Sequence, residues 1–422
     1  MTDREENTSQ MIPRRKLVIF DVEGVLMPKN RFLVFELGRN LSFPQFIKLL
    51  FIGFLYEVGL LSLESALKGM FKLFRGFSVE ELLNVFRKLP LLLHTEAVFA
   101  ELREKGLKTA LVSSGFPQVV VENLASRLKA DYAFGLELEI KNNTLTGSIK
   151  GDVIKKNGKA LIMKKILDRE NLTKQDCVVV ADDRNNSPIF YTESLKIGYN
   201  PDFLIVLKSD HVIRENLLEI VSIFEGTQKR PRYSLSYNEV IRETIHVGGG
   251  VFVILATNYF GAYIVAFLLF LTTLVYIASE LARIKRKNIP LFSSITLNAA
   301  TFSERYEFAM APIFFALGIM LSLLLFPTPL NYASIAIVSF GDSAASIFGK
   351  LLGKTCISFN KGKNLEGSLV GFAFAFFGAV FFLHPLHAFI GAVVGMFVES
   401  FPLPINDNLS IPLAAGVLLT LL

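Results

Sequence analysis

The stretch KLVIFDVEGVL (residues 16–26) begins with a run of β-type residues that ends on an aspartate, Asp21. Two later runs have the same form: TALVSS ends at Ser113, and CVVVAD ends at Asp182. Helical patterns separate the three runs, which is typical of a parallel sheet. Because ligands of such sheets bind at the carboxyl ends of the strands, we expect Asp21, Ser113 and Asp182 to converge at one site.

These residue types suit phosphate chemistry. Phosphoryl transfer to a carboxylate requires a nucleophile, a cation that neutralises the phosphate, and an acid that protonates the leaving group. Asp21 can be the nucleophile, Asp21 and Asp182 can hold Mg²⁺, and Glu23 is placed to be the acid. The alternative is that Asp21 and Asp182 are structural acids in an inactive domain.

The same residues resemble the haloacid dehalogenase superfamily, specifically its phosphoserine-phosphatase-like branch. The resemblance covers roughly residues 16–223. It implies a Rossmann-like α/β domain with a helical cap and a Mg²⁺-dependent phosphatase activity. It also implies that Ser113 binds the phosphate, that Lys159 neutralises it, and that Asp182 with Asp183 forms the acidic metal motif.

The chain departs from that pattern in three places. Glu23 replaces the usual second aspartate, and Asn186 stands where many members have another aspartate. Lys29 and Asn30 occupy the neighbourhood of the acidic residue that would bind a serine amino group. We therefore expect a substrate other than phosphoserine.

Residues 31–95 take the place of the helical cap, and part of this region is very apolar. The stretch LSFPQFIKLLFIGFLYEVGLL (41–61) is interrupted by Lys48 and Glu57, which favours an interfacial helix over a membrane span. Such a cap can lean on a bilayer and admit a lipid phosphate. An apolar cap that packs on its own core is the equal alternative.

Composition divides the chain into two parts. Of its 422 residues 51% are hydrophobic, and from Val247 onward runs such as 262–277 contain no charge. The expected parts are a polar tail (1–15), the phosphatase-like domain (16–225), a polar linker (226–238) and a membrane domain (239–422). The N-terminal residues are polar and acidic, so we expect no cleaved secretory signal, and the two lone cysteines favour a reducing compartment. The formal net charge is +6, and the charged residues lie beside the membrane segments, so we expect no nucleic-acid partner.

The second part is predicted to be an all-α polytopic membrane bundle of about seven helices. Of the three connections on one predicted side, 281–307 and 351–366 carry lysine or arginine and 400–408 carries neither, whereas the connections on the other side, near residues 259, 328 and 384, carry none. This asymmetry follows the positive-inside rule and predicts a multi-pass integral membrane protein whose phosphatase-like domain is cytoplasmic. The predicted spans are about 246–258, 260–279, 308–326, 331–350, 367–383, 385–399 and 409–422.

Ionisable residues recur within these apolar segments. They include GDSAASIFGKLLGK (341–354) and KGKNLEG (361–367). Ionisable groups at membrane depth are costly and usually functional. The predicted topology places nine polar residues near the cytoplasmic face of the membrane. Together they suit the binding of a nucleoside triphosphate and Mg²⁺ beside a lipid acceptor. The alternative for single lysines is that they only anchor the helices at the membrane surface. The nine are Arg242, Asp342, Lys350, Lys354, Lys363, Glu366, Glu399, Asp407 and Asn408, with Gly349 and Gly353 available for backbone contact with the ligand.

This second set resembles the CTP-dependent polyprenol kinase family, which includes dolichol kinase, phytol kinase and the CTP-using diacylglycerol kinase. The resemblance covers about residues 239–422 and rests on the motif Asp342-x-x-Ala-x-x-x-Gly-x-x-x-Gly, then Glu366-Gly, then Glu399 and Asp407-Asn408. Arg242 and His246 fit the family's opening motif. CTP as the phosphoryl donor is implied by this resemblance alone, because no residue spacing in this sequence indicates recognition of a cytosine base.

We therefore expect a bifunctional enzyme in which a lipid-alcohol kinase is fused to the phosphatase. Asp342, Glu366 and Asp407 are the expected Mg²⁺ ligands, and Lys354, Lys363 and Arg242 the expected phosphate contacts. Asp342, Glu399 or His246 can be the base. Acceptors that fit include polyprenol, dolichol-like lipid, geranylgeraniol, phytol and diacylglycerol. Two alternatives remain: a cytidylyltransferase that makes a CDP-activated lipid, and an ion-coupled transporter with a regulatory domain. The sequence sets no oligomeric state.

Overall fold

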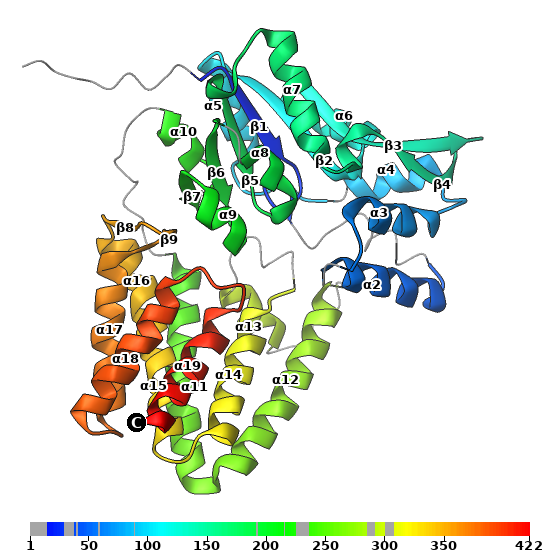
Figure 1. Cartoon of the computed structure of the whole chain (residues 1–422). Helices are drawn as coiled ribbons and strands as arrows, with labels where there is room; N and C mark the ends of the chain where they lie inside the picture. Colours follow the sequence, from blue (N-terminus) through cyan, green and yellow to red (C-terminus); the bar gives the residue numbers. More distant parts are fainter. Residues whose placement is uncertain are drawn as a thin grey trace, which may run out of the picture. The chain divides into compact units, whose positions relative to one another are not determined.

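The computed structural model describes residues 15–28, 38, 41–57, 60–87, 89–190, 193–214, 216–224, 236–284, 292–299 and 308–422. Two compact units are present (Figure 1): one comprises Met1–Pro201 and Lys208–Gln228, the other Asp202–Leu207 and Lys229–Leu422. The predicted tail, most of the predicted linker, and Lys29 with Asn30 lie outside the described residues.

The first unit is built on a seven-stranded sheet with the order β4-β3-β2-β1-β5-β6-β7. Every neighbouring pair is parallel except β3 and β4, so the predicted parallel α/β sheet is confirmed. The strands are β1 (Leu17–Asp21), β2 (Lys108–Pro117), β3 (Tyr132–Lys141), β4 (Thr144–Lys150), β5 (Cys177–Ala181), β6 (Leu195–Tyr199) and β7 (His211–Ile213).

The central strands are apolar because helices cover both faces of a parallel sheet. Every residue of β1 and of β5 is buried. Asp21 lies opposite Val112 of β2, and Phe20 lies opposite Val180 of β5. The residues that follow, Ser113 and Asp182, therefore reach the same edge as Asp21, as the strand endings predicted.

Short helices complete this unit. Three of them, α2 to α4, occupy the region predicted to be the cap, and α2 buries Leu49 and Ile52 while Phe43 and Phe51 are exposed. The helices are α2 (Phe43–Glu57), α3 (Leu63–Lys72), α4 (Val79–Arg87), α5 (Thr95–Glu104), α6 (Gln118–Leu128), α7 (Gly158–Glu170), α8 (Ser187–Phe190) and α10 (Glu219–Phe224). The chain segment between β6 and β7 forms α9 (Phe203–Lys208), of which all but Lys208 belongs to the second unit.

The second unit is a helical bundle with one short β-hairpin, β8 (Cys356–Ile357) and β9 (Asn360–Asn364). A π-helical segment, Ile337–Asp342, joins α15 to α16, so these form one continuous rod. The helices are α11 (Tyr237–Phe260), α12 (Ala262–Ile284), α13 (Phe292–Ala299), α14 (Ala311–Leu325), α15 (Leu330–Ala336), α16 (Ser343–Leu352), α17 (Leu365–Val380), α18 (Pro385–Ser400) and α19 (Asp407–Leu421).

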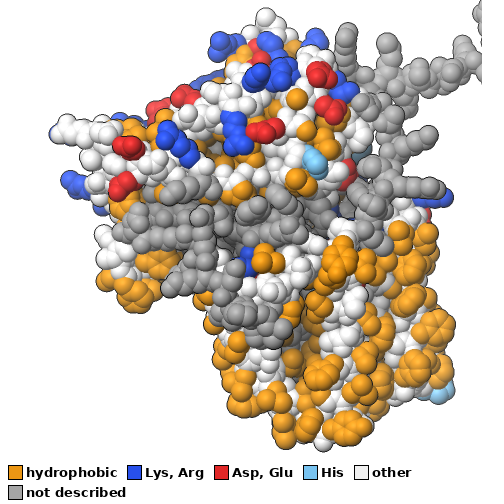
Figure 2. All heavy atoms as spheres, turned by 180° about the vertical axis from the view of Figure 1, so that it is seen from behind, with side chains coloured by type: hydrophobic (Ala, Val, Ile, Leu, Met, Phe, Trp, Pro, Cys, Tyr) orange, Lys and Arg blue, Asp and Glu red, His pale blue; other side chains and the backbone are white. Residues whose placement is uncertain are grey.

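Among the described residues of this bundle, three helices are long and apolar enough to cross a membrane: Tyr237–Phe260, Ala262–Arg283 and Leu330–Leu352. Apolar side chains occupy much of the face of the bundle that Figure 2 shows. Both observations support membrane association. Four further apolar helices (α14, α17, α18 and α19) are shorter, so the count of seven spans, the multi-pass topology and its sidedness stay predictions.

The first membrane helix begins earlier than its predicted span at residue 246. Ser236 caps it: the Ser236 side chain accepts a hydrogen bond from the Glu239 N–H, and the Glu239 carboxylate accepts one from the Ser236 N–H. This capping box starts the helix at Tyr237. Hydropathy detects the apolar part of a helix and does not register a polar first turn.

Candidate active sites

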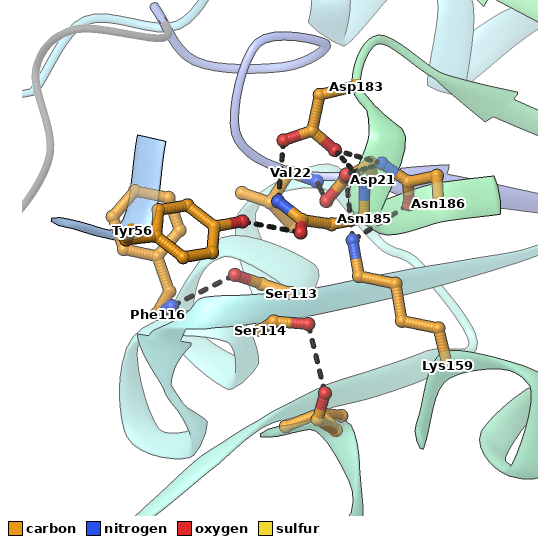
Figure 3. Close-up of polar contacts among 11 residues, drawn as sticks. Asp21, Val22, Tyr56, Ser113, Ser114, Phe116, Lys159, Asp183, Asn185 and Asn186 are labelled. Atoms are coloured by element: carbon orange, nitrogen blue, oxygen red, sulfur yellow. Dashed lines mark hydrogen bonds and ion pairs between the residues drawn. The ribbon is translucent and has the colours of Figure 1, made fainter. Parts of the chain in front are cut away.

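The first site surrounds Asp21 at the carboxyl end of β1 (Figure 3). Asp21 Oδ1 accepts a hydrogen bond from the Val22 N–H at 2.8 Å, and Oδ2 accepts one from Lys159 Nζ at 2.7 Å. Both side chains are buried, at 6% and 5% exposure. The Asp21 carboxylate is therefore held in one orientation by a buried cation, as phosphate chemistry on this residue requires.

Asn186 connects the members of this site. Its Oδ1 accepts a hydrogen bond from Lys159 Nζ at 2.8 Å, and its Nδ2 donates to Asp21 Oδ2 and, at 2.9 Å, to Asp183 Oδ1. An amide can both donate and accept, whereas an ionised aspartate can only accept. Asn186, where the chain departs from the family pattern, thus contacts Asp21, Lys159 and Asp183, and the sequence analysis did not predict these contacts. The one indication in the sequence was that Asn186 lies three residues after Asp183.

Three carboxylates of the site suit a divalent cation. Asp21, Asp182 and Asp183 each offer an oxygen, and these atoms lie within 4.8 Å of one another, the one such acidic group within the described ranges. Hard cations such as Mg²⁺ prefer oxygen ligands of this kind. The donor set fits Mg²⁺: it holds Asp21 and Asp182, expected from the strand ends, together with Asp183, which the family resemblance placed in the metal motif.

Burial and charge shift the ionisation of these groups in opposite directions. Burial raises the pKa of Asp21 above its ordinary value, although the Lys159 charge opposes this. Burial disfavours the charged form of Lys159, yet Asp21 and Asp183 hold the pKa of its ammonium above the ordinary value. The site therefore keeps a cation beside the nucleophile.

Glu23 lies where an acid is needed. Burial, followed by the charge of Asp21, raises its pKa to about 8, so the carboxyl group is protonated at neutral pH and able to donate. Gly115 leaves room for it, because a Cβ there would lie 2.2 Å from Glu23 Oε1. Gly24 has φ +74° and a Cβ on it would meet Asp182 Oδ2 at 2.0 Å, so this position favours glycine, whereas a side chain at position 115 would displace the Glu23 carboxyl group.

The remaining contacts place the phosphate-binding loop and the cap. Ser113 is fully buried, and its Oγ accepts a hydrogen bond from the Phe116 N–H at 2.9 Å. From α2, the Tyr56 O–H donates to Asn185 Oδ1 at 2.5 Å, and its ring lies 5.4 Å from the Arg184 guanidinium carbon. Tyr56 therefore joins the cap to the loop that carries Asp183, a contact the sequence did not predict.

Residues 18–185 match the haloacid dehalogenase-like hydrolase family. The first unit is thus a hydrolase domain of the haloacid dehalogenase class. Within that class it is phosphoserine-phosphatase-like: the chain is 30% identical to a phosphoserine phosphatase of Archaeoglobus fulgidus over 213 residues, or 50% of this chain and 60% of that protein. It is 28% identical to the phosphoserine phosphatase of Methanocaldococcus jannaschii over 50% of this chain and 98% of the relative.

A different relative is phytol kinase 1, chloroplastic, of Arabidopsis thaliana. It is 26% identical over 220 residues, which is 46% of this chain and 69% of that protein. The chain therefore resembles both a phosphatase and a lipid kinase, and Mg²⁺ is supported for the phosphatase domain.

The second site lies in the helical bundle, around Lys363 of β9. Lys363 Nζ donates to Glu399 at the end of α18 and to Asp407 Oδ2 at the start of α19, the latter at 3.0 Å. Burial opposes the charge of Lys363, but Asp407, Glu399 and then Asp342 raise the pKa of its ammonium above the ordinary value. The structure thus brings together Lys363, Glu399 and Asp407, with Asp342 near enough for its charge to act on Lys363; the kinase role of this group stays a prediction.

The opening motif lies on α11 as a charged group. Arg242 Nε donates to Glu243 Oε1 at 3.2 Å, and His246 Nδ1 lies 4.0 Å from Glu243 Oε2. Phe315 of α14 stacks on the His246 ring with centroids 4.4 Å apart. Glu243 therefore binds Arg242 and lies beside His246; it was not singled out from the sequence.

Glu366 is placed differently from the prediction. Its carboxylate accepts hydrogen bonds from the N–H groups of Lys354 and Thr355 at 3.1 Å. Asp342, Glu366 and Asp407 do not form a group with ligand atoms within 4.8 Å in the described chain. Glu366 instead orders the turn after α16, because its carboxylate accepts charge-assisted hydrogen bonds from these two backbone N–H groups.

The two glycines of the motif have a packing role. A Cβ on Gly367 of α17 would lie 2.7 Å from the Gly349 Cα, and a Cβ on Gly353 would lie 2.2 Å from the Gly349 oxygen. Small residues allow this close helix contact. The predicted phosphate contact of Gly349 and Gly353 remains a prediction.

Asn408, at the start of α19, has a feature that points to a ligand. It is 6% exposed, and its Oδ1 has no hydrogen-bond partner among the described residues. Buried polar atoms normally have partners. An amide oxygen beside the Asp407 carboxylate fits Mg²⁺, as predicted for this residue.

Proposed function

We propose that the chain is a bifunctional membrane enzyme: the first unit hydrolyses a phosphate monoester, and the second transfers the γ-phosphoryl group of CTP to a long-chain lipid alcohol. The first activity is supported by the buried Asp21–Lys159 pair beside three clustered carboxylates. The second is supported by the Lys363 cluster together with the similarity to phytol kinase. Its acceptor is an isoprenoid alcohol by that similarity.

In the phosphatase reaction Asp21 attacks the phosphorus, and the bond to the leaving oxygen breaks. Protonated Glu23 gives its proton to that oxygen, and its carboxylate then takes a proton from the water that hydrolyses the aspartyl phosphate. Lys159 holds Asp21 and offsets the phosphate charge. Mg²⁺, when bound by Asp21, Asp182 and Asp183, neutralises the phosphoryl oxygens.

In the kinase reaction the lipid hydroxyl attacks the γ phosphorus in line, and CDP leaves. Lys363 and Arg242 offset the phosphate charge. Asp342, Asp407 and Asn408 are the groups that suit Mg²⁺, which lowers the charge on the β and γ phosphates when bound. Asp342, Glu399 and His246 are the groups able to accept the hydroxyl proton.

The test uses the full-length protein in liposomes with CTP labelled on either the α or the γ phosphorus. Label from the γ position in the lipid supports the kinase. Label from the α position supports cytidylyl transfer and contradicts the kinase. Solute flux without consumption of CTP supports the transporter alternative. An Asp342→Ala variant that phosphorylates lipid at the wild-type rate contradicts the assigned site.

A further inference from the structure

An apolar cavity of about 230 Å³ lies between α11, α12, α13 and α14 of the helical unit. Its walls are formed largely by apolar side chains such as Leu269, Ile295 and Phe315. Arg242 and His246 line the same cavity from α11. The cavity thus combines an apolar wall with the opening motif of the proposed kinase site.

The hydroxyl groups around this cavity are not equivalent. Thr272 and Thr273 donate to Leu268 and Leu269 oxygens of their own helix at 2.7 and 2.8 Å. Side chains bonded in this way turn their methyl groups outward and add apolar surface. The polar atoms that α12 contributes here are therefore already satisfied.

Thr296 of α13 is the exception. Its side chain is 5% exposed, and Oγ1 has no hydrogen-bond partner within the described ranges. A buried hydroxyl without a partner is destabilising, so a ligand oxygen in the cavity is a stabilising partner for it. This observation, independent of the apolar lining, points to a ligand that carries one polar group.

The polar side of the cavity leads to the charged site. Arg242 Nε donates a hydrogen bond to Glu243 Oε1, and His246 Nδ1 lies 4.0 Å from Glu243 Oε2. The His246 ring stacks on the Phe315 ring. A hydroxyl bound beside His246 and Thr296 therefore lies next to groups of the proposed kinase site, while the attached chain is covered by α12 and α14. Most sites for small ligands combine an apolar lining with a few fixed polar groups in this way.

From these contacts we infer that the cavity binds the hydroxyl end and first chain segment of the lipid-alcohol acceptor. The inference rests on the proposed kinase function, since it assigns the acceptor site of that reaction. Arg242 and His246 face the hydroxyl, Thr296 Oγ1 shares a hydrogen bond with it, and the chain lies against Leu269, Ile295 and Phe315.

The test places a larger side chain in the cavity. Ala316→Phe, on the cavity wall of α14, is expected to raise the KM for a lipid alcohol by roughly tenfold or more without changing the KM for CTP. The matched control is Ala414→Phe on α19, which is equally half-buried but does not line the cavity, and it leaves both constants unchanged. Equal effects of the two variants overturn the inference.

A second pair of variants covers the case in which Ala316→Phe fails to fold. Thr296→Val keeps the shape but removes the hydroxyl, and it is expected to raise the acceptor KM several-fold. Thr296→Ser restores the hydroxyl and is expected to restore the KM. No change with Thr296→Val overturns the assigned hydrogen bond.

Cross-linking separates the inference from the proposed function. A farnesol analogue with a photoreactive diazirine in its chain is illuminated with the full-length protein in liposomes, without CTP. Labelled peptides from α12 or α14 that Ala316→Phe removes and Ala414→Phe retains support the cavity, even if no phosphoryl transfer is found. Transfer by the wild-type protein with cross-links only elsewhere overturns the cavity and leaves the kinase standing.

Discussion

At the residue scale, the phosphatase site is held together by hydrogen bonds among its buried polar side chains. Lys159 is shared by Asp21 and Asn186, and Asn186 also donates to Asp183. A buried ion pair of this kind is destabilising to break because the remaining charge is uncompensated. The amide of Asn186 therefore has both a structural and a catalytic consequence.

Replacement of Asn186 by alanine tests that role. The change removes one acceptor from Lys159 and two donated hydrogen bonds from the carboxylates, and it is expected to lower the free energy of unfolding of the first unit by about 1–3 kcal/mol. The measurement is thermal unfolding of the full-length protein followed by a first-unit probe. Asn123→Ala, at an exposed position of α6, serves as the control, and an equal or larger loss there argues against the role given to Asn186.

The protonation of Glu23 predicts a pH dependence of the phosphatase. Because burial and Asp21 raise its pKa to about 8, the acid form is present below pH 8 and is lost as the pH rises through that value. We expect the hydrolysis rate of an aryl phosphate at saturating Mg²⁺ to fall on the alkaline side. Glu23→Gln should lower the rate by about 10²–10⁴-fold and remove this alkaline limb. A variant that keeps the limb shows that another group titrates there.

At the element scale, the strands were predictable because each is a short apolar run ending on a polar residue. β1 and β5 are buried on both faces, so their apolar pattern is nearly continuous and hard to mistake. The convergence of Asp21, Ser113 and Asp182 followed from that pattern and from the rule for parallel sheets.

Other parts of both sites could not be predicted because they depend on tertiary contacts. The bonds of Glu366 to the Lys354 and Thr355 N–H groups depend on how the hairpin turns back to α17. The contact of Tyr56 with Asn185 joins residues 129 apart in the chain. The start of α11 depended on a polar cap that a hydropathy window does not register.

The packing of β5 predicts a difference between the two cysteines. Cys177 is fully buried, and burial raises the pKa of its thiol to about 12, whereas Cys356 of β8 is partly exposed. We expect iodoacetamide at pH 8 to label Cys356 and to leave Cys177 unmodified until the first unit is unfolded, because the thiolate is the reactive form. Peptide mass spectrometry gives the readout; rapid native labelling of Cys177 contradicts the burial of β5.

At the scale of the whole molecule, each unit contains a charged site built from its own residues. The first has a nucleophile, a cation, an acid and clustered metal ligands; the second has a lysine held by two carboxylates in an apolar bundle. The presence of both kinds of site in one chain supports the proposal of two phosphoryl-transfer reactions.

The most direct test of two separate sites asks whether a single substitution in each site abolishes one activity and leaves the other intact, in the full-length protein in liposomes. Transfer of γ label from CTP to a lipid alcohol and hydrolysis of an aryl phosphate are measured side by side. Asp21→Asn is expected to lower hydrolysis by at least roughly 10³-fold and to leave transfer intact, and Asp342→Ala to do the reverse. Transfer that survives in Asp342→Ala, or that is absent from the wild-type protein, contradicts the account.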